Sequence, residues 1–270
     1  MAREVQPPRV QGRRPPAGLA TGPGPSPHLA IVPFRESPPA DCPVLLIPGF
    51  LCGDASMRPL AAALEDHGHP AYPSGIACNV DCSEAALGPL LGLVGDLAAR
   101  HRAPVAVIGH SRGGLFARVI ARRRPDLVSA VVTLGTPHRD PWRTHPWLWA
   151  QALAFSVLGS LGFPGTMTVA CGLGACCAGF WRDVAAPPPP TVRVLSIYST
   201  TDGMVDWRAC LEHDGRHAEV RAGHYELPGH AATAPIVLAA LAGLSNRPAI
   251  DRRAGAAASG SDACSTAAAA

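Results

Sequence analysis

The stretch APVAVIGHSRGGLFARVIARRRPDLV, residues 103–128, decides the fold. An apolar run at 105–108 leads into Gly109-His110-Ser111-Arg112-Gly113, and an apolar-periodic segment with arginines follows. The run predicts a buried strand, and the periodic segment predicts a helix. A serine on a sharp turn between a strand and a helix is the arrangement of a nucleophile elbow. An ordinary Ser/Gly turn would give the same pentapeptide, so the rest of the chain has to separate the two.

Strand and helix patterns alternate outward from this stretch. Helical periodicity covers DASMRPLAAALEDHG, with Asp54 as N-cap and Gly68 as stop, and SEAALGPLLGLVGDLAARH. Strands are predicted at 44–47, 71–72, 105–108, 128–134 and 192–198, with a last short one in HAEVRAGH. Because no hairpin signals separate them, the sequence predicts an α/β fold, a mostly parallel sheet covered by helices on both faces.

Length and composition predict one folded domain with non-globular ends. A chain of 270 residues with 47% apolar residues can bury a full core as one domain. We expect the Pro/Gly/Arg-rich segment 1–28 and the Ala/Ser-rich tail 246–270 to be disordered, and the domain to occupy 29–245. The N-terminus lacks the apolar region of a secretory signal, so the expected compartment is the cytoplasm.

The charged residues and cysteines argue against nucleic-acid binding, a complete disulfide framework and a metal site. All 23 basic residues are arginines in short clusters without interleaved aromatic residues, which argues against nucleic-acid binding. Nine cysteines are an odd number in a long chain, so a complete disulfide framework is not implied. Zinc binding by His67, His69, Cys78 and Cys82 is disfavoured by loose spacing, and we expect buried free thiols instead.

Candidate catalytic residues fall at the carboxyl ends of the predicted strands, where function collects in such sheets. Gly109 and Gly113 allow a turn so tight that Ser111 projects its hydroxyl into the cleft. The Arg112 N–H, at the start of a helix, is one candidate donor to an oxyanion. The second is expected after the first strand, at Phe50 with Leu51 next to it.

The acid and base are expected later in the chain. Asp202 and Asp206 follow the strand at 192–198, and Asp202 is preferred because Gly203 beside it marks the turn. Asp206 is expected to cap a helix or to be a surface charge. Of four histidines beyond them, His224 follows the last short strand and is the preferred base. The others are His230, kept in reserve, and His213 and His217, expected as solvated positions.

The set LLIPGF, VIGHSRGG, VVTLGTPH, YSTTDGMVDW and RAGH resembles the bacterial lipase and esterase branch of the α/β-hydrolase superfamily, over nearly all of residues 42–245. The resemblance implies an α/β-hydrolase fold, a Ser111, Asp202 and His224 triad, and Phe50 and Arg112 as oxyanion-hole donors. Many relatives have His-Gly where this chain has Pro48-Gly49, which changes how that loop is braced. Little chain precedes Val44, so we expect the usual first two strands to be missing or rudimentary.

An apolar insertion is predicted at about 138–190. No Asp, Glu, Lys or Arg occurs in residues 144–181, and four of the five tryptophans lie in or beside this segment. We expect a lid over an apolar pocket, or a surface that contacts a membrane or lipid interface. A membrane hairpin is the alternative, but Gly162, Pro164 and Gly165 interrupt its apolar run.

These features together predict a serine hydrolase of carboxylic esters. It would act through an acyl-enzyme intermediate on a small-molecule or lipid ester with an apolar acyl chain, without metal or organic cofactor. Two alternatives stay open: an acyltransferase that uses the same acyl-enzyme, and a catalytically silent binding protein with the same fold.

Overall fold

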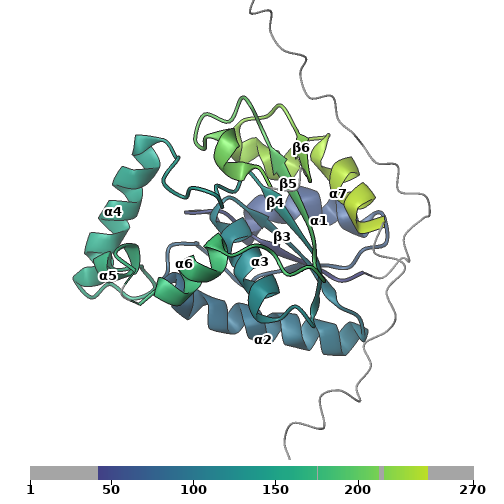
Figure 1. Cartoon of the computed structure of the whole chain (residues 1–270), viewed down its shortest axis with the longest axis horizontal. Helices are drawn as coiled ribbons and strands as arrows, with labels where there is room; N and C mark the ends of the chain where they lie inside the picture. The colour runs from purple at the N-terminus through teal and green to yellow at the C-terminus, as the bar shows by residue number, and fades with distance from the viewer. Residues whose placement is uncertain (1–41, 175, 213–215, 243–270) are drawn as a thin grey trace, which may run out of the picture. The chain divides into compact units, whose positions relative to one another are not determined.

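Six parallel strands form one sheet in the computed structural model, which describes residues 42–174, 176–212 and 216–242 (Figure 1). Their order is β2-β1-β3-β4-β5-β6, and each neighbouring pair is parallel. The expected tails at 1–28 and 246–270 lie outside the described residues. The strands are β1 (Val44–Ile47), β2 (Ala71–Pro73), β3 (Val105–His110), β4 (Val128–Leu134), β5 (Arg193–Tyr198) and β6 (His217–Glu219).

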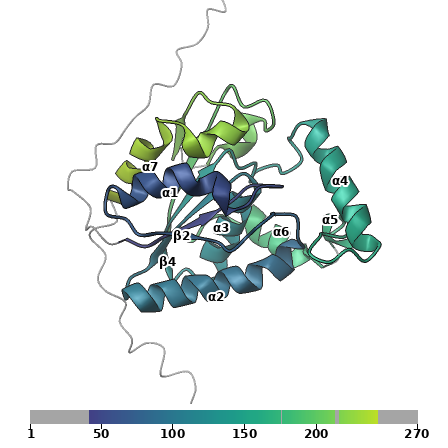
Figure 2. The same cartoon turned by 180° about the vertical axis from the view of Figure 1, so that it is seen from behind.

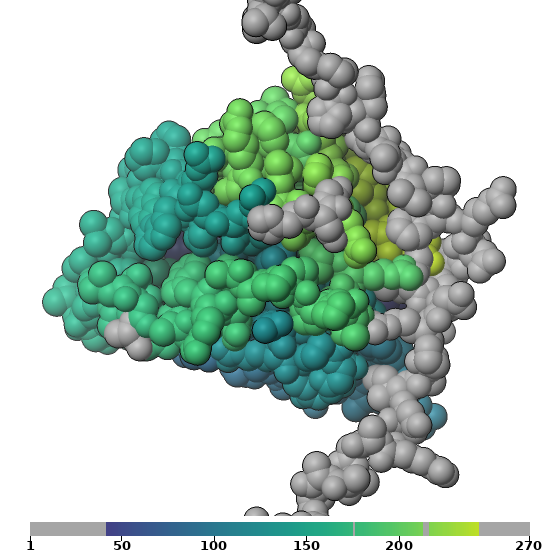
Figure 3. All heavy atoms as spheres, in the orientation of Figure 1, coloured from purple at the N-terminus to yellow at the C-terminus, as the bar shows by residue number. Residues whose placement is uncertain are grey.

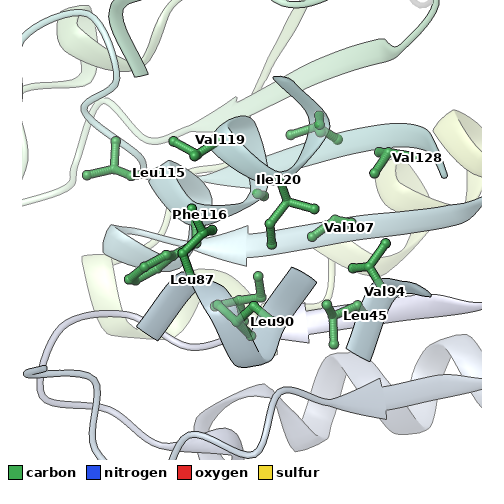
Figure 4. Close-up of a cluster of buried hydrophobic side chains, with 14 of the residues drawn as sticks. Leu45, Leu87, Leu90, Val94, Val107, Leu115, Phe116, Val119, Ile120 and Val128 are labelled. Atoms are coloured by element: carbon green, nitrogen blue, oxygen red, sulfur yellow. The ribbon is translucent and has the colours of Figure 1, made fainter. Parts of the chain in front are cut away.

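The helices cover both faces of this sheet, as predicted (Figures 1 and 2). One face packs against α2 (Ser83–His101), α3 (Arg112–Arg123) and α6 (Ala178–Ala185), and the other against α1 (Arg58–Glu65) and α7 (Thr233–Ala242). Figure 4 shows the first core, where Phe116 and Ile120 of α3 lie among Leu45, Val107 and leucines of α2. Successive strand residues serve opposite cores, so all six residues of β3 are buried.

Asp54 does not cap the first helix, contrary to the prediction. A short 3₁₀ helix, η1 (Asp54–Met57), precedes α1, and Gly53 is its N-cap. The Asp54 carboxylate instead accepts hydrogen bonds from the N–H groups of Ser74 and Gly75, at 3.0 and 2.8 Å, and from the Ser74 hydroxyl. An aspartate ahead of an apolar-periodic run can therefore accept hydrogen bonds from a neighbouring loop rather than from the N–H groups of its own helix.

The predicted insertion divides into a buried and a projecting part. Phe180 and Val184 of α6 are buried in the core, and the Phe180 ring packs edge-on against Phe116. In contrast, α4 (Pro146–Ser160) and α5 (Val169–Gly172) extend beyond the sheet (Figures 1 and 2). Exposed apolar side chains on and beside them include Trp142, Trp147, Leu153, Leu161, Phe163 and Leu173.

The segment that carries α4 is attached to loops of the sheet at both ends by backbone hydrogen bonds. Thr144 forms an antiparallel bridge with Val205, and the His145 N–H donates to the Met204 carbonyl at 2.7 Å. At the other end, the Met167 N–H donates to the Val80 carbonyl at 2.7 Å. Among the described residues, no helix is long and apolar enough to cross a bilayer.

Candidate active site

Ser111 lies on the sharp turn between β3 and α3. Its φ of 51° and ψ of −118° place a non-glycine residue in a region that side chains rarely adopt. A Cβ on Gly109 would collide with the backbone of Gly113 and Gly114, and one on Gly113 would collide with the carbonyl of Ile47. The two glycines therefore allow α3 to start close against β1 and β3, as the sequence predicted.

A continuous hydrogen-bond relay joins three of the predicted site residues. His224 Nε2 lies 3.0 Å from Ser111 Oγ, and His224 Nδ1 lies 2.6 Å from Asp202 Oδ2. His224 begins a 3₁₀ helix, η3 (His224–Gly229), after β6, and Asp202 lies in the turn after β5. All three side chains are buried or nearly so. Nδ1 faces a carboxylate, so it carries the proton and leaves Nε2 free to accept one from the serine.

The Asp202 carboxylate is held in place from two sides. Its second oxygen, Oδ1, accepts hydrogen bonds from the N–H groups of Met204 and Val205, each at 2.8 Å. Gly135, after β4, has a φ of 56°, and a Cβ there would lie 3.3 Å from Asp202 Oδ2 and 3.2 Å from His224 Nδ1. The glycine in LGTPH thus leaves room for the acid and base to meet.

The reserve candidates lie outside the relay. Asp206 caps a 3₁₀ helix, η2 (Trp207–Cys210), by accepting from the Arg208 N–H, and it also pairs with Arg143. This matches its expected role as a cap or surface charge. His230 Nδ1 accepts from the Ala232 N–H. His213 lies outside the described residues, and His217 packs edge-on against Tyr198 rather than standing in solvent as expected.

The two predicted oxyanion donors are available at the same strand ends. Among the described residues, the backbone N–H groups of Phe50 and Arg112 form no hydrogen bond. The N–H of Leu51, the alternative donor, points instead to the Asn79 carbonyl at 3.4 Å. Leu51 has a φ of 61°, a left-handed conformation that turns the chain after Phe50.

Asn79, which the sequence did not single out, braces the loop after β1. Its Nδ2 donates to the Pro48 carbonyl at 2.8 Å, and its N–H donates to the Cys52 carbonyl at 2.9 Å. The Arg112 guanidinium in turn donates to both the carbonyl and the side-chain oxygen of Asn79. Pro48-Gly49 therefore has a brace from another loop, which a motif search along one segment cannot find.

His110, beside the nucleophile, is a second residue that the sequence did not assign. It is 1% exposed, and its Nε2 donates to the His224 carbonyl at 2.9 Å. Burial, together with the nearby His224 ring, lowers the pKa of His110 to about 3. Its other nitrogen, Nδ1, is buried without a partner among the described residues. The ring is therefore neutral and positions the loop that carries His224.

The four residues considered as zinc ligands do not converge. His67 bonds to the Ala63 carbonyl at the end of α1, and Cys78 contacts the Leu51 carbonyl. Cys78 is exposed, so the expectation of buried thiols is wrong there. Cys82 lies with a different set of thiols, described below.

The projecting insertion approaches the site through one aromatic contact. The ring of Phe155 in α4 packs edge-on against Phe50, with centroids 6.3 Å apart. Figure 3 shows a hollow between the atoms of α4 and those of α6. The donor loop after β1 therefore has an apolar neighbour from α4.

Comparisons with known proteins agree with the fold that the sequence predicted. A family model described as alpha/beta hydrolase fold matches residues 99–162, which include Ser111 and its flanking strand and helix. A triacylglycerol lipase from Pseudarthrobacter phenanthrenivorans is 54% identical over 43 residues, 16% of this chain and 14% of that lipase. Lipase LipV from Mycobacterium tuberculosis is 29% identical over 144 residues, 53% of this chain and 50% of LipV. The matches thus span half or less of these relatives.

A solved structure extends the likeness to most of the chain. The mature lipase BlEst2 from Bacillus licheniformis superposes with a TM-score of 0.56, covering 78% of this chain and 96% of that one at 15% identity. At this identity the likeness shows the fold alone.

Proposed function

We propose that this chain, which belongs to the α/β-hydrolase superfamily in its bacterial lipase and esterase branch, hydrolyses carboxylic esters with Ser111 as nucleophile. The observation that carries the proposal is the relay from Ser111 Oγ through His224 to Asp202, at 3.0 and 2.6 Å, on a strained turn. A serine, an imidazole and a buried carboxylate in this order have the geometry of acyl transfer.

The first half of the reaction forms an acyl-enzyme. Ser111 Oγ attacks the ester carbonyl carbon while His224 Nε2 takes its proton, and the N–H groups of Phe50 and Arg112 donate to the resulting oxyanion. The imidazolium then gives that proton to the leaving alcohol as the carbon–oxygen bond breaks. Asp202 keeps the proton of Nδ1 in place and stabilises the positive ring.

The second half regenerates the enzyme. Water loses a proton to His224 Nε2 and attacks the acyl carbon, and the proton returns to Ser111 Oγ as the carboxylic acid leaves. One water is consumed, and one acid and one alcohol are produced. Every step uses side chains and backbone groups of this chain and needs no metal or organic cofactor.

The insertion supports an apolar acyl group as the substrate. Residues 144–181 carry no formal charge, and Phe155 contacts the donor loop at Phe50. Leu153 is 62% exposed and Leu161 is 73% exposed, so the projecting part presents an apolar surface. Such a surface suits contact with a lipid interface, and α4 would act as a lid over the site.

A panel of p-nitrophenyl esters of increasing acyl length, run on wild-type protein and Ser111→Ala, tests the proposal. We expect Ser111→Ala to lower kcat by a factor on the order of 10⁶ without changing the far-UV spectrum. A fluorophosphonate should label the wild type but not the variant. The control is Ser56→Ala, whose hydroxyl bonds to the Gly53 carbonyl away from the relay. Activity of Ser111→Ala within tenfold of the wild type would contradict the assignment.

A further inference from the structure

Four cysteine thiols gather beside the start of α2, outside the relay. They are Cys82, directly before α2, and Cys171, Cys176 and Cys177 of the insertion, and all four sulfurs lie within 4.8 Å of one another. Neighbouring Sγ atoms are 3.3 to 3.8 Å apart. Within the described ranges, no other group of three or more His, Cys, Asp or Glu side chains is close enough to hold a metal.

The geometry points to a tetrathiolate site for one zinc ion. Zinc binds thiolates at about 2.3 Å in a tetrahedron, which separates neighbouring sulfurs by about 3.8 Å. The observed separations are close to this edge length, so four thiolates can surround a single ion after small side-chain movements. A tetrahedron of four cysteine sulfurs is one of the ligand sets that hold zinc in structural sites.

The sulfurs are not arranged as two disulfide pairs. In a disulfide each sulfur has one partner, at about 2.05 Å. Here Cys176 Sγ has three sulfur neighbours, Cys171, Cys177 and Cys82, at 3.3, 3.6 and 3.8 Å. Cys82 Sγ is also shared, since Cys177 Sγ lies 3.5 Å from it. One centre contacted by four sulfurs explains this sharing, whereas pairing does not.

Thr168 contacts one of the four sulfurs, that of Cys171, through two polar groups. The Thr168 N–H donates to Cys171 Sγ at 3.3 Å, and the Thr168 hydroxyl lies at the same distance from it. Such hydrogen bonds to a ligand atom are a usual part of metal sites.

The Arg112 guanidinium places a positive charge beside the four cysteines, next to Cys82. It donates to the Asp81 carbonyl and to the Ser83 hydroxyl, the two residues that flank Cys82. Among the described residues, no carboxylate lies within salt-bridge distance of this half-buried guanidinium. Zinc with four thiolates carries a net charge of −2, so it would offset the positive charge of Arg112.

This site would fasten the insertion to the catalytic domain. Three of its ligands come from the segment at 171–177, and the fourth precedes the helix that Arg112 contacts through Ser83. Arg112 and Asn79 connect it to the oxyanion loop through two further hydrogen bonds. The ion would be structural, because all four positions are taken by protein sulfurs.

Metal analysis of the whole chain tests the inference. The protein is expressed with added zinc and purified with a non-chelating reductant, and bound metal is measured by elemental mass spectrometry. We expect about one zinc per chain, released by a mercurial reagent, and a cobalt-substituted form with the strong visible bands of tetrahedral thiolate coordination. Ser111→Ala should bind the same amount, which separates this result from the proposed hydrolysis.

Matched cysteine variants identify the ligands. We expect Cys171→Ser and Cys177→Ser to reduce bound zinc at least about tenfold. Cys42→Ser and Cys78→Ser, whose sulfurs lie outside the cluster, should keep it. The inference is overturned if wild-type protein binds no zinc or cobalt, or if its intact mass shows that the four thiols have formed disulfides. These wild-type measurements decide the matter even where a variant fails to fold.

Discussion

Replacing His110 with glutamine should make the stability of the protein less sensitive to acid. The ordinary pKa of histidine is 6.5, and burial lowers that of His110 to about 3 in the folded protein. Between these values the unfolded chain binds a proton that the folded protein does not. His110 therefore does not lower the free energy of unfolding above about pH 6.5, and it lowers this free energy progressively as the pH falls toward 3.

The size of the effect follows from the two pKa values. At about pH 5 they predict that His110 alone lowers the free energy of unfolding by about 2 kcal/mol relative to its value near neutrality. A glutamine amide at this position can still donate to the His224 carbonyl, which His110 Nε2 contacts at 2.9 Å, but the amide does not titrate.

Urea unfolding followed by circular dichroism, at several pH values between about 7.5 and 5, measures the difference. We expect the free energy of unfolding to fall less in His110→Gln than in the wild type, by about 2 kcal/mol over this range. Other buried histidines, such as His69, lower the free energy of unfolding at acid pH by the same amount in the wild type and in His110→Gln. Ser111→Ala, which removes a non-titrating neighbour, should follow the wild type. Parallel curves for His110→Gln and the wild type would refute the reasoning.

Three further predictions concern the acid, the turn and the insertion. Asp202→Asn should lower kcat on a soluble p-nitrophenyl ester by about 10⁴, because it favours the wrong tautomer of His224, whereas Asp206→Asn should stay near the wild type; the reverse order would move the acid to Asp206. Gly113→Ala should lower both the melting temperature and kcat, because its Cβ would push Ile47 and Pro48 away from α3; unchanged values in a thermal melt and ester assay would argue against close packing there. Leu153→Asp should weaken binding to lipid vesicles about tenfold, because it removes an exposed leucine that would be buried in the lipid on binding. Hydrolysis of a short soluble ester should stay unchanged. Equal vesicle binding of the two proteins in a sedimentation assay would show that this surface does not meet lipid.

The sheet could be predicted because its signals are local. The run at 105–108 is apolar and β-branched, glycines follow it, and β3 and α3 form there as expected. Asp202 and His224 could be selected because parallel strands bring their carboxyl ends to one edge, so residues after different strands meet. The structure does bring both residues to Ser111.

What could not be predicted depends on partners from distant segments. Asn79 looks like an ordinary loop residue until the structure places it between the Pro48 carbonyl and Arg112. Cys82 was considered with Cys78 because they are close in sequence, yet its neighbours lie some ninety positions further along. The insertion could be recognised from its lack of charge, but composition does not show that α6 joins the core while α4 projects from it.

The two attachments that enclose α4 make this segment a unit that can be exchanged by protein engineering. Thr144 is bridged to Val205, and the Met167 N–H is bonded to the Val80 carbonyl, so both ends of the segment between them are fixed by main-chain groups. Main-chain hydrogen bonds are kept when most side chains are exchanged, because no side-chain atom takes part in them. A different helix could therefore be grafted between these two points to alter substrate preference, while the turn that carries Ser111 and the sheet beneath it keep their sequence.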